Sequence, residues 1–316
     1  MNIKTRVALA SLLCALGSQA MASSQASASI SNLKFQLIDL NPLDGVAASV
    51  SYNGGSTSLS LSGNDGSTGD SDSASRTRSG YMSFSRVYEI SLDNVSGTAS
   101  IGNGDLNVSG SANGLSTSFN ASAMAYASQL QLSANSLLII TADAAVAAAA
   151  LNAPDCYSNY YRCGASESAS ASASMSLSYN YYTSTGSTSV SYGDSVGASA
   201  QSQGAQDVSN YYYDWYYCYY YGYYCSSSPT HYDKTEQSVS SSRTFSAVFM
   251  NTSSSAQTAY FSLNTNISGY ATSPSVEAAG GVANVTPVPE AGTTALALVG
   301  AAVVGGVATR RRRLAA

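Results

Sequence analysis

The sequence predicts an all-β protein, a single antiparallel β-sandwich of jelly-roll type with about ten to twelve strands. Several long segments alternate apolar and polar residues with a period of two, which places one face of a strand on a core and the other in water. Turn signals rich in Gly and Asn separate these segments, and antiparallel sheets accept one solvated face. Hydrophobic residues make up 44% of the chain, so the abundant serine does not indicate disorder.

The first element is a predicted signal peptide, residues 1–22. Lys4 and Arg6 form a positive n-region, Val7–Leu16 is apolar, and Ala20-Met21-Ala22 matches a cleavage site. The mature protein should therefore begin near Ser23, and residues 23–275 should form the sandwich as an exported domain.

The strands are predicted from their alternation. From Ala169 to Tyr181 the odd positions are apolar or aromatic, and the even positions from Ser170 to Ser178 are all serine. The segment Leu137–Leu151 is rich in alanine, which favours a helix, but Leu138, Ile140 and Val146 keep the strand period, so we expect a strand. Similar alternation occurs in Leu115–Ala125, Phe245–Phe249 and Ala259–Ile267, and turn signals occur at Asp44-Gly45, Asn53-Gly54-Gly55, Asn64-Asp65-Gly66, Asn113-Gly114 and Gly186.

Charge argues against two classes of partner. Lys4, Arg6 and Arg310–Arg313 account for six of the 13 basic residues, so the remaining seven face 18 acidic ones and the body carries a net charge near −11. Nucleic acids and anionic lipid surfaces both require clustered Lys and Arg. We therefore expect neither as a partner of the exported domain.

Four cysteines of the predicted mature chain have a repeated spacing. Cys156 and Cys163 are separated by six residues, as are Cys218 and Cys225. In an oxidising compartment these cysteines should form disulfides, and of the three possible connectivities we favour the two local pairs. Zinc is the alternative for four cysteines, but its sites prefer closer spacing.

Tyrosine is concentrated around the second cysteine pair. Eleven of the fourteen residues from Tyr211 to Tyr224 are Tyr or Trp. Alternate residues of an extended loop point to opposite sides, so such a run cannot be buried completely. Two interpretations remain open: the rings pack the two loops against each other, or they form a contact surface for polysaccharide or protein. The candidate contacts are Tyr213, Trp215, Tyr217 and Tyr220.

Residues with catalytic or metal-binding chemistry are few. His231 is the single histidine, no phosphate-binding glycine loop is present, and we expect no enzymatic activity and no cofactor. Asp65, Asp70 and Asp72 lie in a Gly-containing segment whose spacing suits calcium, although the EF-hand order is absent. A solvated loop is the preferred interpretation, with calcium as the alternative.

The C-terminal segment predicts membrane insertion. Residues 276–290 form a linker, and Ala291–Thr309 is an uncharged stretch of 19 residues. As a helix it would extend about 28 Å, close to the ~30 Å thickness of a hydrocarbon core. The basic tail, residues 310–316, begins with four arginines, Arg310, Arg311, Arg312 and Arg313, which should remain cytoplasmic.

This tail resembles the PEP-CTERM sorting signal of Gram-negative bacteria, a segment also named after the C-terminus of ice-binding proteins. Pro289 and Glu290, the apolar span and the arginines match the family's order, whereas Ala291 replaces the second proline of Pro-Glu-Pro. The resemblance covers about a tenth of the chain and implies recognition and cleavage by a membrane enzyme, an exosortase.

These observations together predict a non-enzymatic exported protein of the cell envelope, cell surface or extracellular matrix, associated with biofilm exopolysaccharide. One alternative is a carbohydrate-binding adhesin that uses the Tyr-rich loops. Another is a self-assembling surface fibre, because alternating strands of low charge can pair edge to edge.

Overall fold

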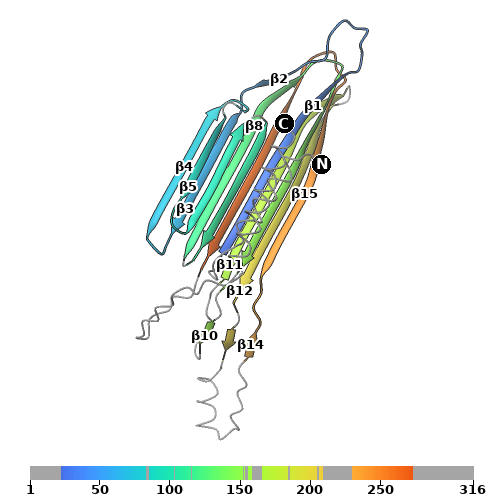
Figure 1. The fold of residues 1–316 in the computed structure, drawn as a ribbon. Coiled ribbons are helices and arrows are strands. Elements are labelled where there is room, and N and C mark those ends of the chain that lie inside the picture. Colours follow the sequence, from blue (N-terminus) through green and yellow to red (C-terminus); the bar gives the residue numbers. More distant parts are fainter. Residues whose placement is uncertain are drawn as a thin grey trace, which may run out of the picture. The chain divides into compact units, whose positions relative to one another are not determined.

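The computed structural model describes residues 23–82, 85–102, 104–114, 116–151, 153, 156–158, 166–183, 186–204, 206–208 and 230–272. These residues form sixteen β-strands and no helix, and they belong to one compact unit, Met21–Ser275 (Figure 1). Most strands lie in two large antiparallel sheets whose inner faces enclose a single core. The predicted all-β class is confirmed. No helix in the described part of the chain is long and apolar enough to span a membrane.

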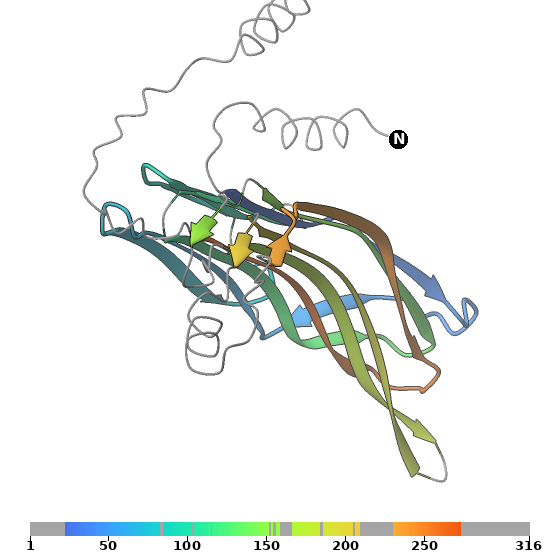
Figure 2. The same cartoon turned by 90° about the horizontal axis from the view of Figure 1, so that it is seen from below.

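The first sheet has six strands in the order β15-β9-β1-β7-β6-β5, and the second has the order β12-β11-β16-β8-β3-β4 with β2 added on β8. A small third sheet, β10-β13-β14, lies beyond one end of the sandwich, and Figure 2 shows its three short strands side by side. The first-sheet strands are β15 (Gln237–Asn251), β9 (Ser136–Leu151), β1 (Ser23–Asp39), β7 (Asp105–Asn113), β6 (Val95–Gly102) and β5 (Arg86–Ser91). The others are β12 (Gly186–Gln203), β11 (Ser166–Thr183), β16 (Gln257–Ala271), β8 (Thr117–Leu132), β3 (Ser56–Asp65), β4 (Asp70–Ser79), β2 (Val50–Asn53), β10 (Cys156–Ser158), β13 (Gln206–Val208) and β14 (Thr230–Tyr232).

Alternation along the strands decides which side chains enter the core. On β11 the predicted inward positions from Ala169 to Tyr179 are all buried, and the intervening serines face outward. The alanine-rich segment 137–151 lies in β9, so the strand prediction for it is confirmed. The largest fully buried side chains include Phe245, Phe249 and Phe261, which fill space between rows of small alanines.

Strand number and sheet size depart from the prediction. Twelve strands have six or more residues, and four short ones that no alternation revealed raise the total to sixteen in the described residues. A jelly roll has about eight strands, so these sheets are larger. The predicted turns at Asn53-Gly54-Gly55 and Asn113-Gly114 do separate strands, and Gly55 and Gly114 adopt φ of +100° and +87°, a region that favours glycine.

One long side of the sandwich is closed by contacts between edge strands. Arg243 of β15 forms an ion pair with Asp194 of β12, with 3.0 Å between Nη1 and Oδ1. The backbone N–H of Gln201 donates to Oε1 of Gln237 at 3.0 Å. The edges β12 and β15 are therefore linked to each other.

The opposite side has β4 and β5 as its edge strands. On β4, Arg76 and Asp72 are in register with the buried residues Leu59 and Gly63, so charged residues occupy core-facing positions at this edge. Such charges discourage pairing of an edge strand with another chain.

Candidate functional site

The predicted cysteine and tyrosine contacts fall almost entirely outside the described residues. Cys163, Cys218, Cys225, Tyr213, Trp215, Tyr217 and Tyr220 are not described, and Cys156 is described only as backbone at the start of β10. The disulfides and the aromatic surface remain predictions. The sorting residues Pro289, Glu290 and Ala291 and the arginines Arg310–Arg313 also lie outside the described part.

The structure does bring together segments that flank both cysteine pairs. β10 begins at Cys156, β13 precedes the second pair and β14 follows it. β13 pairs with β10 in parallel and with β14 in antiparallel orientation. His231 belongs to β14, in register with Asp207. Three segments that are distant in the sequence thus meet in one small sheet.

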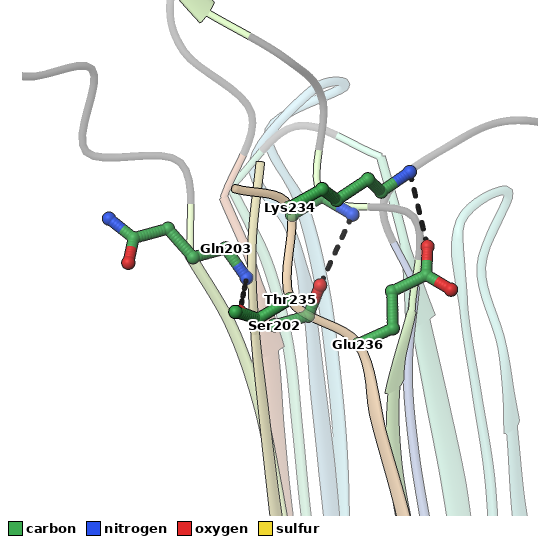
Figure 3. Close-up of polar contacts among 6 residues, drawn as sticks. Ser202, Gln203, Lys234, Thr235 and Glu236 are labelled. Atoms are coloured by element: carbon green, nitrogen blue, oxygen red, sulfur yellow. Dashed lines mark hydrogen bonds and ion pairs between the residues drawn. The ribbon is translucent and has the colours of Figure 1, made fainter. Parts of the chain in front are cut away.

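A polar group of residues lies where this sheet joins the sandwich (Figure 3). The backbones of Gln203 and Thr235 form two hydrogen bonds of 3.1 and 2.8 Å. The Lys234 ammonium and the Glu236 carboxylate form an ion pair at 3.1 Å, and both side chains are about 40% exposed. These contacts fasten the end of β12 to the segment that leads into β15.

Glu167 is the most unusual residue at this end. It lies at the start of β11, in register with Ser202 and Ala271, and is fully buried. Neither carboxylate oxygen has a hydrogen-bond partner. Burial raises the pKa of Glu167 to about 7, although the charge of Lys234 acts in the opposite direction. The protonated acid is therefore favoured in the folded protein below about pH 7.

The acidic segment considered for calcium is arranged as a hydrogen-bonded turn. Oδ1 of the buried Asp65 accepts from the N–H and the hydroxyl of Ser67, at 3.1 and 2.5 Å. Oδ2 accepts from the backbone and side-chain nitrogens of Asn94, at 3.0 and 3.1 Å. Asp70 and Asp72 are exposed on β4. Within the described residues no group of three or more His, Cys, Asp or Glu side chains is placed to hold a metal ion.

Hydrogen bonds to Asp65 also affect its ionisation. The Ser67 hydroxyl is the main cause that lowers the pKa of this carboxyl, with smaller contributions from Asn94. Both oxygens of the ionised carboxylate accept hydrogen bonds from Ser67 or Asn94, and these bonds stabilise the turn. Sequence spacing did not reveal this role, because Asn94 is 29 residues away along the chain.

The outer face of the second sheet carries hydroxyl and amide side chains at regularly spaced positions on adjacent strands. Across the strands, Ser170 is in register with Ser268, which is in register with Asn120, and Asn120 is in register with Ser62. Cross-strand hydroxyl pairs form on this face between Ser170 and Ser268 (2.8 Å), Ser176 and Ser262 (2.7 Å) and Ser60 and Ser122 (2.8 Å).

A shallow groove of about 450 Å³ crosses this face. The residues that line it and face outward include no charged residue. Tyr270, which is 42% exposed, is the one aromatic residue among these outward-facing lining residues. The other outward residues come from β3, β8, β11 and β16: Ser62, Asn64, Ser118, Asn120, Ser168 and Ser268.

Glycines allow the Phe119 ring to pack closely beneath the groove. In the row that faces the core, Phe119 of β8 stands between Gly269 of β16 and Gly63 of β3. A Cβ at Gly269 would lie 2.4 Å from Cε1 of Phe119, and one at Gly110 of the first sheet would lie 2.4 Å from its Cδ2. The Phe119 ring thus uses the space that side chains at these glycines would need, so both glycines are required for close packing under the groove.

Comparisons with protein-family models, with curated proteins and with solved structures find no match for this chain.

Proposed function

We propose that the protein is a non-enzymatic exported component of the cell envelope or extracellular matrix, associated with exopolysaccharide and sorted by its PEP-CTERM-like tail. The observation that carries the proposal is the outer face of the second sheet, where Ser and Asn side chains recur in register over adjacent strands. Such a face is strongly hydrated and offers both donors and acceptors to neutral polymers.

The two chain ends support export. The predicted signal peptide, residues 1–22, would direct translocation, and the span 291–309 with its arginines would hold the precursor in the membrane. An exosortase-type enzyme is the processing partner implied by Pro289 and Glu290. Cleavage there would release the sandwich to the cell surface or matrix.

The adhesin alternative is favoured by one specific observation. β10, β13 and β14 flank the cysteine-containing segments and pair with one another. The segment with the second cysteine pair begins and ends in this small sheet, and the segment with the first pair begins there. The two segments would then present their tyrosines close together, as a contact surface for sugar or protein requires.

The fibre alternative has less support. Edge-to-edge growth needs an accessible edge strand, and β12 and β15 are linked through Arg243 and Asp194. The other edge carries Asp72 and Arg76 at core-facing positions, which opposes addition of another chain.

Fractionation of the producing cells tests the proposal. The protein should occur in the envelope or matrix fraction, and deletion of the exosortase should leave it as an inner-membrane precursor. A variant that ends before residue 291 is the matched control, because it lacks the span and should be secreted whether or not the enzyme is present. Recovery of the full-length chain in the cytoplasm of both strains would refute the proposal.

A further inference from the structure

We propose that the groove on the outer face of the second sheet binds a neutral polysaccharide chain, with Tyr270 as the ring on which one sugar unit stacks. This inference depends on the proposed function, since it names the kind of molecule that the exported protein contacts. It assigns the contact to the sheet face and not to the Tyr-rich loops.

The groove has the chemistry that a sugar chain requires. Its outward residues are serine hydroxyls, the amides of Asn64 and Asn120, and one phenol ring. Hydroxyls and amides each donate and accept, so they match sugar hydroxyls, which do the same. No charged side chain lines the groove. An anionic polymer would find no cation there, so the ligand should be neutral.

Tyr270 has room for a sugar ring above it. It is 42% exposed, and its neighbours in register on the adjacent strands are Ser168 and Ser118. Both are too small to cover an aromatic ring. A phenol ring offers a large apolar face with a polar tip, which suits the apolar face of a sugar together with its hydroxyl rim.

The extent of the groove favours a chain over a small solute. Its lining comes from four adjacent strands, β11, β16, β8 and β3. Three intervals of ~4.8 Å between strands correspond to about 14 Å across the sheet. A ligand of that length would lie across the strands and contact Ser168, Ser268, Asn120 and Ser62 in turn. The groove is open to solvent and is not an enclosed cavity, so a polymer can reach it from the surface.

Tyr260 provides a matched control. It lies on the same strand and faces outward like Tyr270, and it is 57% exposed, but it does not line the groove. Ten residues separate the two tyrosines, which corresponds to about 33 Å along a strand. A general effect of removing a surface tyrosine from β16 should be equal at both positions, whereas loss of a groove contact should be specific to Tyr270.

The experiment is affinity electrophoresis of the exported, processed protein in gels that contain dextran, soluble mannan, soluble β-glucan or the producing strain's own neutral exopolysaccharide. Alginate serves as the anionic comparison. The wild type should be retarded by at least one neutral polymer and not by alginate. Tyr270→Ala and Asn120→Ala should each weaken the retarding affinity about threefold to tenfold, and Tyr260→Ala should leave it unchanged.

Three results would overturn the inference: no retardation by any neutral polymer, retardation by alginate alone, or equal retardation of Tyr270→Ala and the wild type. Both groove residues are exposed, so the variants should unfold at the wild-type urea midpoint, and Asn120→Ala provides a second reading if Tyr270→Ala does not fold. Export is measured separately. An exported protein that binds no neutral polymer refutes only the groove assignment, whereas a protein that remains in the cytoplasm refutes the proposed function.

Discussion

The carboxylate of Asp65 accepts hydrogen bonds from both the backbone and the side-chain nitrogen of Asn94, at 3.0 and 3.1 Å. Asp65 ends β3 in the second sheet, and Asn94 immediately precedes β6 in the first. The two sheets are therefore joined by a polar contact on the side away from the Arg243–Asp194 ion pair. These polar contacts on both sides hold the two sheets against each other. They therefore help to keep the second sheet, whose outer face carries the groove, in place.

Replacement of Asp65 tests this link. Asp65→Ala should lower the free energy of unfolding by about 2 kcal/mol, because it removes several charge-assisted hydrogen bonds that Ser67 and Asn94 donate. Urea unfolding at neutral pH measures the change. Asp72→Ala, an exposed change on the neighbouring strand, should have little effect. Equal stability of the two variants would contradict the role assigned to Asp65.

Acid should weaken the same link. The pKa of Asp65 is lowered in the folded protein, so its contribution to stability is present above the ordinary carboxyl pKa and is lost as pH falls through the lowered value. Wild-type stability should therefore decrease below about pH 4, and Asp65→Ala should show a smaller decrease. Parallel pH profiles for the two proteins would count against this linkage.

Glu167 should produce the opposite dependence. Its pKa is raised from 4.5 to about 7 in the folded protein. Burial of Glu167 therefore costs least stability below pH 4.5, where the carboxyl is protonated in both the folded and the unfolded chain. The free energy of unfolding should decrease as pH rises from there through the folded-state pKa. Glu167→Gln should stabilise the protein by up to about 3 kcal/mol at alkaline pH and change it little in acid. Thermal unfolding across the pH range measures the difference, with the exposed Glu89→Gln as control. A constant offset at every pH would show that Glu167 does not titrate as described.

Glycine at 269 should be required for packing. A Cβ there would lie 2.4 Å from the Phe119 ring, so Gly269→Ala should destabilise the sandwich by about 1–3 kcal/mol. At Gly193 a Cβ would meet nothing within 4 Å, and Gly193→Ala should be tolerated. The double variant Gly269→Ala with Phe119→Leu should be less unstable than the sum of its single changes, as unfolding free energies in a double-mutant cycle would show. Strict additivity would mean that the clash is not the cause.

Cys156, Cys163, Cys218 and Cys225 should form the local pairs Cys156–Cys163 and Cys218–Cys225. Each pair would close a short loop and contribute about 2–2.5 kcal/mol through chain entropy. Peptide mapping without reduction decides the connectivity. A peptide that joins a cysteine of the first pair to one of the second would refute the local scheme.

Much of the fold was predictable because it depends on local alternation. The serine period on β11 and the alternation in segment 137–151 identified buried positions correctly, since a period of two determines which face a residue occupies. The order of strands was not predictable, because it depends on pairing between segments far apart, such as β1 with β9. The short strands β10, β13 and β14 carry too few residues to show any period.

The polar surface was less accessible to sequence reasoning. Serine at alternate positions predicts a solvated face, but the groove depends on which strands lie side by side. Ser168, Tyr270, Ser118 and Asn64 become neighbours only through the register of four strands. Glu167 is in phase with the buried positions of β11 that begin at Ala169, so the period of two could have indicated its burial. Its charge argued against a core position, and the stretch of alternation identified from the sequence begins only at Ala169.

Intact mass spectrometry of the protein recovered from the envelope or matrix of the producing cells tests the central proposal most directly. We expect a species that lacks residues 1–22 and the C-terminal arginines Arg310–Arg313, and we expect Glu290→Ala to accumulate as an uncut precursor in the inner membrane. A mature protein that retains the complete tail while an exosortase is active would contradict processing, and a chain that retains residues 1–22 as well would contradict export.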